Sequence, residues 1–214
     1  MSWFTPESFD HDVPRRYLEA FDAIWTHLST PGAWLDGAER VAVASETRSD
    51  APPAPIVADI AEDDLLADTA RRIAQTPERL HRDWFDAVTG RIGYGPYAEV
   101  AALVTQIVPI DRFCRLLGRP LEPLPHPVAG VPERVEPTDV VERGAWLPVQ
   151  DLPGANVVSS LSYVPVDNLL RLGVVRALYS GTNFADLRWA DRALSRPQIE
   201  LLAARTSAHN KCFY

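Results

Sequence analysis

The chain has 214 residues, of which 46% are hydrophobic and 23% charged, a balance typical of a folded globular protein. Its net charge of −8 at pH 7, with lysine nearly absent outside Lys211, excludes the clustered basic surface of a nucleic-acid or anionic-membrane binder. No stretch approaches the roughly 18 apolar residues that span a bilayer, and the N-terminus lacks the pattern of a secretory signal, so we expect a cytoplasmic protein.

Helical periodicity begins near the N-terminus. Between residues 13 and 28, apolar side chains recur at intervals of three and four, which predicts a helix with one buried face. A second helix is expected around residues 41–44. The prolines of residues 49–56 prevent its continuation, because proline lacks an amide donor and clashes with the preceding turn.

Three further helices are expected before residue 118, at 62–74, 78–88 and 97–117. Thr76 can cap the helix at 78–88, because its hydroxyl can accept from free backbone amides, and Pro77 fits the first turn. Pro109 lies inside the longest helix and is expected to kink it. Glu99, on the same apolar helix, is interpreted either as a desolvated functional carboxylate or as part of an exposed face.

Residues 119–148 contain seven prolines and little periodicity, which predicts an extended connector over the surface. The connector separates an N-terminal helical half, residues 1–118, from a C-terminal helical half, residues 149–214. Helices of the second half are expected at 156–163, 166–178, 184–192 and from Pro197, the last with Ser195 as its N-cap. Almost no strand pattern appears, so the predicted fold class is all-α.

The two halves show a weak internal repeat at an offset of 159 positions. The aligned pairs are Leu35 with Leu194, Val43 with Leu202, Ala44 with Ala203, and Thr47 with Thr206. In this alignment Glu200 falls on Val41 and Cys212 falls on Pro53. The first copy therefore lacks a carboxylate and a thiol at these positions and is interpreted as a degenerate repeat.

Near the C-terminal end, Glu200 and Cys212 are twelve residues apart. Arg205, His209 and Lys211 make the approach to Cys212 basic, which favours the thiolate form in which a cysteine reacts. An unbroken helix would separate Glu200 and Cys212 by about 18 Å along its axis, so a turn within residues 207–210 is expected to fold the thiol back.

This segment resembles the alkylhydroperoxidase D and carboxymuconolactone decarboxylase superfamily, whose redox members carry a glutamate, a spacer, a Cys-x-x-Cys pair and then a histidine. Glu200 and Cys212 match the glutamate and the first cysteine, whereas the second cysteine and the histidine have no counterpart in this sequence. The resemblance implies an alkylhydroperoxidase D-like helical fold with two repeated halves. It also implies Cys212 as the peroxidatic or thiol-exchanging residue and Glu200 as its general base.

The function implied by the resemblance is that of a thiol-dependent peroxidase or antioxidant enzyme, which acts on a small-molecule peroxide and is regenerated by a thiol reductant protein. A homo-oligomer is expected, with no cofactor, and the spacing of the histidines suggests no metal site. Whether the chain stops before a second cysteine or works with a single thiol stays open, as does a resolving role for Cys114.

Two alternative functions also remain open. One is a non-catalytic helical scaffold or assembly partner of the same fold. The other is a carboxymuconolactone decarboxylase-like enzyme on a small lactone, in which Arg205 or Arg188 would hold a carboxylate bidentately.

Overall fold

The structure is a computed structural model that describes residues 2–180 and 192–210. Within these ranges the helices are α1 (Arg15–Leu28), α2 (Gly37–Thr47), α3 (Leu65–Gln75), α4 (Arg82–Ile92), α5 (Tyr94–Leu116), α6 (Asn156–Ser159), α7 (Pro165–Val175) and α8 (Arg196–His209). The strands of the described chain are β1 (Val140–Val141) and β2 (Val149–Gln150), which form one short antiparallel pair. The prediction of an all-α class is confirmed, and the small β1–β2 pair is an addition to it.

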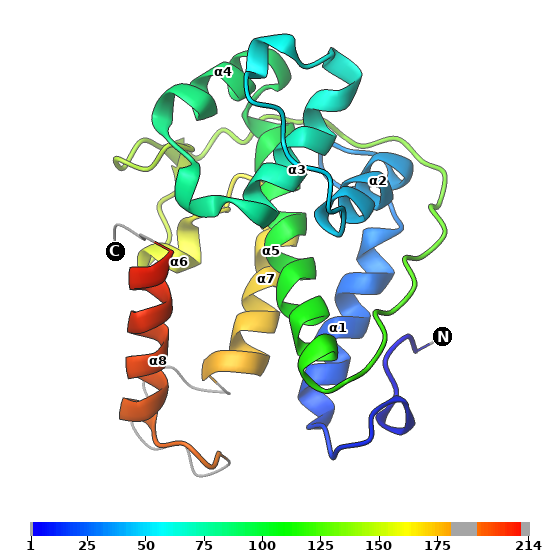
Figure 1. Ribbon diagram of the computed structural model, residues 1–214. Coiled ribbons are helices and arrows are strands. Elements are labelled where there is room, and N and C mark those ends of the chain that lie inside the picture. Colours follow the sequence, from blue (N-terminus) through cyan, green and yellow to red (C-terminus); the bar gives the residue numbers. More distant parts are fainter. Residues whose placement is uncertain (1, 181–191, 211–214) are drawn as a thin grey trace.

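Helix α5 runs through the centre of the molecule and contacts α1, α2, α3, α4 and α7 (Figure 1). It is apolar around most of its circumference, as expected for a helix that is surrounded by others. Its fully buried side chains include Val100, Leu103, Ile107 and Ile110. The helix continues through Pro109 to Leu116.

Helix α4 begins later than the sequence pattern predicts. The prediction that Thr76 and Pro77 open this helix is wrong, because the Thr76 hydroxyl bonds instead to the Arg72 carbonyl at 3.3 Å and closes α3. Pro77–Arg79 form only a short 3₁₀ turn. The N-cap of α4 is His81, whose Nδ1 accepts from the Trp84 amide at 3.2 Å.

A glycine joins α4 to α5. Gly93 has a φ of 83°, in the left-handed region that a residue with a Cβ atom rarely adopts. This backbone conformation lets the chain leave α4 at Ile92 and start α5 at Tyr94, so the two helices are joined by one residue. The tight turn places Arg91, Ile92, Gly93 and Pro96 where, together with residues of α2 and α3, they line a pocket described below.

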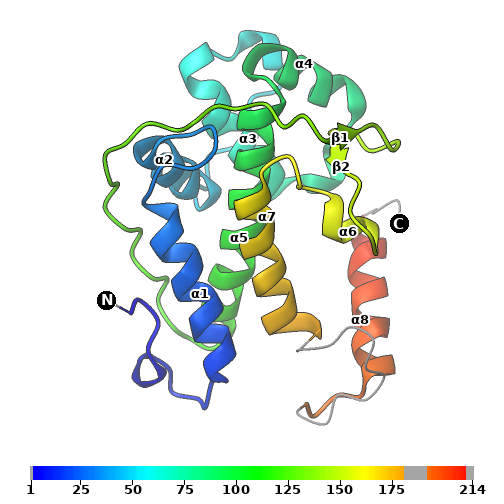
Figure 2. The ribbon, with the colours of Figure 1, turned by 180° about the vertical axis from the view of Figure 1, so that it is seen from behind.

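The proline-rich connector crosses the surface from the end of α5 to β1 (Figure 2). It is attached to the N-terminal helices by hydrogen bonds. The Pro123 carbonyl accepts from Trp25 Nε1 at 2.9 Å, and the Glu122 carbonyl accepts from Arg48 Nη1 at 2.9 Å. Further along, the Val128 amide donates to the Ser29 carbonyl at 2.8 Å. The connector is therefore a fixed strap rather than a loose linker.

The helices after the connector differ in how they pack. Helix α7 lies against α1 and α5, and its buried Val174 joins Phe21 and Ile110 in one hydrophobic cluster. A helix was expected over residues 166–178. The α-helix ends at Val175, and a single π-helical turn, Arg176–Ser180, follows it. The expected helix at 156–163 is helical only at α6, and the one at 184–192 lies, except for its last residue, outside the described residues.

Helix α8 stands at the edge of the molecule in both views (Figures 1 and 2). It starts after the N-cap Ser195, as predicted, and none of its residues is buried. Leu201 and Leu202 are 62% and 55% exposed. Among the described helices, none is both long and apolar enough to cross a membrane.

Candidate functional site

Three charged side chains from three helices meet in the interior. Arg40 of α2 is fully buried, and its Nη2 and Nη1 donate to the two carboxylate oxygens of Asp167 of α7 at 3.0 and 3.3 Å. Nη1 of Arg40 also donates to Oε1 of Glu99 of α5. Glu99, Arg40 and Asp167 form what we term the buried charge cluster.

The surroundings of the buried charge cluster supply further partners. Oε2 of Glu99 accepts from the backbone amides of Trp34 and Leu35 at 2.7 and 3.3 Å. Gln106 Nε2 donates to the Asp167 carbonyl at 2.8 Å, and His27 Nε2 of α1 lies 3.5 Å from Asp167 Oδ1. Four helices and the loop before α2 are therefore joined at one point.

The two carboxylates of the cluster have opposite pKa shifts. Burial alone raises the pKa of Asp167, but the adjacent His27 ring and the Arg40 guanidinium outweigh it and lower the pKa to about 2. Burial raises the pKa of Glu99, Arg40 opposes this shift, and the charge of Asp167 adds to it. Arg40 and Asp167 are thus a charged pair, and of the two carboxylates of the cluster Glu99 takes up a proton more readily.

The cluster is closed to solvent. The side chains of Arg40, Glu99 and Asp167 are at most 1% exposed, so no substrate reaches them in this conformation. The interpretation of Glu99 as part of an exposed face is wrong, because Glu99 is fully buried and contacts Arg40. The expected desolvation of this carboxylate is confirmed. Its contacts assign it a structural role in holding helices and the Trp34 loop together.

Gly32 closes the loop over the cluster. A Cβ atom at this position would lie 1.9 Å from Glu99 Oε1 and 2.2 Å from Arg40 Nη1. The Gly32 amide donates to the Leu35 carbonyl at 2.9 Å, which folds residues 32–35 into a tight loop. One side of this loop covers the cluster, and Trp34 and Leu35 also line a pocket.

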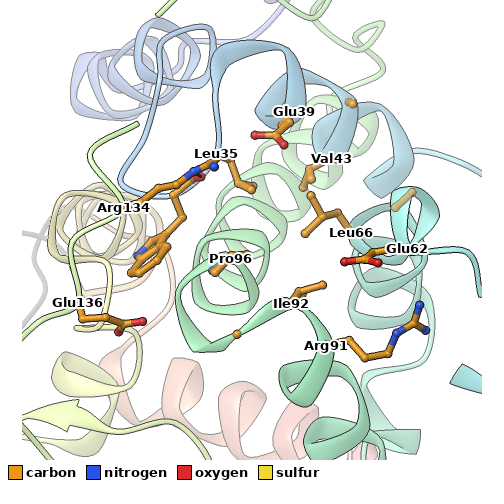
Figure 3. A pocket seen from close by; sticks show the side chains of 14 residues that line it. Leu35, Glu39, Val43, Glu62, Leu66, Arg91, Ile92, Pro96, Arg134 and Glu136 are labelled. Atoms are coloured by element: carbon orange, nitrogen blue, oxygen red, sulfur yellow. Dashed lines mark hydrogen bonds between the residues drawn. The ribbon is translucent and has the colours of Figure 1, made fainter. Parts of the chain in front are cut away.

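This pocket has a volume of about 650 Å³ and opens between α2, α3, the α4–α5 turn and the connector (Figure 3). The volume is within the range of about 300–1,000 Å³ common for small-molecule sites. Its apolar lining includes Leu35, Val43, Leu66, Ile92 and Pro96. Its charged lining consists of Glu39, Glu62, Arg91, Arg134 and Glu136. We term it the α2–α3 pocket.

Glu200 lies on the first turns of α8, away from the buried charge cluster. Its Oε2 accepts from the Tyr179 hydroxyl at 2.6 Å, and Arg196 Nε donates to its Oε1 at 3.3 Å. The carboxylate side chain is 45% exposed. Burial and the Glu200 carboxylate raise the pKa of Tyr179 to about 12, so the phenol remains a hydrogen-bond donor at neutral pH. Tyr179 was not identified from the sequence, because only the π-helical turn brings it opposite α8.

Cys212 and Arg188 lie outside the described residues, and Arg205 is exposed on α8. A turn was expected within residues 207–210. Helix α8 instead continues to His209, and the chain leaves the helix only at its C-cap, Asn210. Glu200 is therefore about 15 Å from Asn210 along the helix axis. The helix places the carboxylate and the beginning of the Cys212 segment at opposite ends.

Cys114 is buried on α5. Its Sγ accepts from Arg119 Nη1 at 3.6 Å. Burial raises the pKa of the Cys114 thiol, and Arg119 offsets this only in part. Cys114 is therefore a poor nucleophile in the folded protein, since a cysteine reacts as its thiolate.

Among the described residues, no group of three or more histidine, cysteine, aspartate or glutamate side chains is arranged to hold a metal ion. No family model, no curated protein and no solved structure matches this chain. The function therefore has to be inferred from the residues and their geometry.

Two glycine substitutions test whether the loop over the cluster is sterically closed. We expect Gly32→Ala to destabilise the fold by about 1–3 kcal/mol, because the added carbon overpacks the Glu99–Arg40 contact. Gly90→Ala on the exposed face of α4, where an added Cβ meets nothing within 4 Å, should stabilise by about 0.5–1 kcal/mol. Urea denaturation of both variants measures this difference. Equal stabilities would contradict the close approach at Gly32.

The lowered pKa of Asp167 predicts a specific acid dependence of stability. The stabilisation that it gives is fully present above its unfolded pKa of about 3.9 and is lost as the pH falls toward about 2. We expect the free energy of unfolding of the wild type to fall across this window, and the slope to be shallower in Asp167→Asn. Urea titrations between pH 6 and 2.5 measure it, with Asp86→Asn of the exposed Arg82–Asp86 pair as control. Identical slopes for the wild type and Asp167→Asn would rule out this linkage.

Proposed function

We propose that this chain is a thiol-dependent peroxidase or thiol-exchange protein of the alkylhydroperoxidase D-like superfamily. In this proposal Cys212 attacks a small-molecule peroxide, Glu200 acts as the base, and a thiol reductant protein restores the cysteine. The observation that carries the proposal is the 2.6 Å hydrogen bond from Tyr179 to Glu200, which holds the motif carboxylate in a defined, half-exposed position.

The positions of two helix starts support the duplication that this superfamily implies. The N-cap of α2 is Asp36 and the N-cap of α8 is Ser195, which is the offset of 159 positions found in the sequence. In both helices the side chain three residues on, Glu39 or Gln198, accepts from the N-cap amide at 2.8 Å. Equivalent capping at equivalent positions favours a common origin of the two helices.

The chemistry requires a thiolate and a route for its proton. The Cys212 thiolate attacks one peroxide oxygen, the O–O bond breaks, and the sulfur becomes a sulfenic acid while the other oxygen leaves and takes up a proton. Two thiol equivalents from the reductant then reduce the sulfenic acid to the thiol and release water. Because α8 separates Glu200 from its own C-terminal end, the proton would reach Glu200 through an intermediate group. Tyr179, which contacts Glu200 directly, would be the last member of such a relay, since a phenol can accept a proton while it gives its own to the carboxylate.

A second candidate is a non-catalytic assembly partner of the same fold. The exposed Leu194, just before α8, and the exposed Leu201 and Leu202 on α8 favour it, because exposed apolar side chains that lie close together in the chain suit association with another protein surface or a second copy. The lactone alternative depends on Arg205, which is exposed on α8, and on Arg188, which lies outside the described residues.

Peroxide treatment distinguishes the enzyme from the assembly partner. We expect brief, stoichiometric peroxide with a sulfenic-acid trap to label the wild type and Cys114→Ser at one site and to leave Cys212→Ser unlabelled. The reason is that Cys114 is buried and has a raised pKa, so it cannot compete in the folded protein. Intact-mass analysis measures the adduct. Slow labelling that is equal at both cysteines would reject the peroxidase and leave the assembly partner.

The Tyr179–Glu200 pair is tested separately through rates. We expect Tyr179→Phe and Glu200→Gln each to slow the formation of the sulfenic acid by about 10-fold or more, in line with the loss of a general base. Tyr163→Phe is the matched control, because it removes a similar tyrosine–glutamate hydrogen bond, from Tyr163 to Glu136 of the connector, and leaves the Tyr179–Glu200 pair intact. Stopped-flow trapping measures the rates. If the two test variants react as fast as Tyr163→Phe, the pair takes no part in the reaction.

A further inference from the structure

The α2–α3 pocket takes no part in the proposed thiol chemistry, which involves Cys212, Glu200 and Tyr179. Its residues come from the loop before α2, from α2, from α3 and the short turn that precedes it, from the α4–α5 junction and from the connector. The pocket combines an apolar lining with charged side chains of both signs, and these side chains indicate which class of ligand it would bind.

Arg134 of the connector is the most unusual residue of the pocket. It has a φ of 53°, and among the described residues no other non-glycine residue has a positive φ. Its amide donates to the Ala33 carbonyl at 2.9 Å and its Nε donates to the Trp34 carbonyl at 3.2 Å, which holds the strained backbone in place. Backbone strain of this kind persists where the surrounding structure enforces it, often at ligand sites.

The outer half of the Arg134 guanidinium is available to a ligand. Its Nη1 and Nη2 donate to no acceptor among the described residues, and two such donors match the two oxygens of a carboxylate. Trp34, which also lines the pocket, has a buried Nε1 without an acceptor in the described part of the chain. Arg91 differs from Arg134, because its Nη1 and Nη2 donate to the carbonyls of Val57 and Ile60 at 3.0 and 2.9 Å.

Carboxylates exclude a simple anion from the same pocket. Glu39, Glu62 and Glu136 all line it, and Figure 3 shows Glu39 and Arg134 near Leu35, with Leu66 and Ile92 beyond. One oxygen of Glu39 accepts from the Asp36 amide at 2.8 Å, and the other has no partner among the described residues. An anion alone would be repelled by three carboxylates, and a cation alone would face the free guanidinium of Arg134.

We propose that the α2–α3 pocket binds an aliphatic α-amino acid. The carboxylate of this zwitterion is held by Arg134, its ammonium group by Glu39, and its side chain by the apolar lining at Leu35, Val43 and Leu66. Arg134 and Glu39 do not form an ion pair with each other in the described structure, so both are open to the ligand. The pocket thereby gives the protein a binding function that is independent of its cysteines.

Calorimetric titration with L-leucine tests the proposal, alongside 3-methylbutylamine and 4-methylpentanoate, which each lack one of the two charged groups. We expect leucine to bind the wild type at least 10-fold more tightly than either analogue. Arg134→Gln and Glu39→Gln should each weaken leucine binding at least 10-fold, and Glu39→Gln keeps an oxygen for the Asp36 amide. Arg143→Gln, an exposed arginine of the β1–β2 loop, should bind as the wild type does.

Arg134→Gly separates ligand binding from folding. Glycine adopts a positive φ without strain, so this variant should unfold at no lower urea concentration than the wild type while it loses leucine binding. Absence of leucine binding to the wild type at millimolar concentration would overturn the proposal. Binding of 3-methylbutylamine as tight as that of leucine, or unchanged leucine binding in Arg134→Gly, would also overturn it.

Discussion

The fold depends on one buried guanidinium shared between two carboxylates. Removing Arg40 and Asp167 from water costs several kcal/mol for each ion, and this cost is offset only where the ions pair closely and their remaining polar atoms find partners. Here Asp167 is held through both oxygens and Glu99 accepts two backbone amides in addition to Arg40. The loop before α2 is fixed as a result, and with it the wall of the α2–α3 pocket. The buried ion pairs of Arg40 thus help to determine the shape of the α2–α3 pocket at the surface.

Sequence patterns among neighbouring residues predicted most helices, but they did not reveal the contacts between residues that are far apart in the sequence. The periodicity of residues 13–28 and the cap at Ser195 match α1 and α8, since both depend on neighbouring residues alone. The start of α4 was predicted wrongly because the Thr76 hydroxyl can either cap a helix that follows it or donate to a carbonyl of the helix that precedes it. In the structure it donates to the Arg72 carbonyl at the end of α3. Nothing local marks Arg40 for burial, because its partner Asp167 is 127 positions away.

The candidate sites show the same division. Glu200 was recognised from a motif, but its partner Tyr179 depends on a π-helical turn that no residue pattern announces. Glu99 was recognised as a carboxylate on an apolar helix, and only the packing of α2 and α7 against α5 decided that it is buried. The α2–α3 pocket could not be anticipated, because it forms where the connector passes the loop at Trp34.

The long sequence separation of the contacts that complete the core has a consequence for how the chain acquires its structure. Helix α2 carries Arg40 early in the chain, whereas Asp167 is synthesised much later, and the connector that accepts from Trp25 lies between them. During translation the first helices can therefore form and associate, but they cannot bury Arg40 with both of its counterions until α7 emerges. Such non-local closure is slow compared with helix formation. The complete set of Arg40 ion pairs is therefore expected to form late, after α7 has been synthesised.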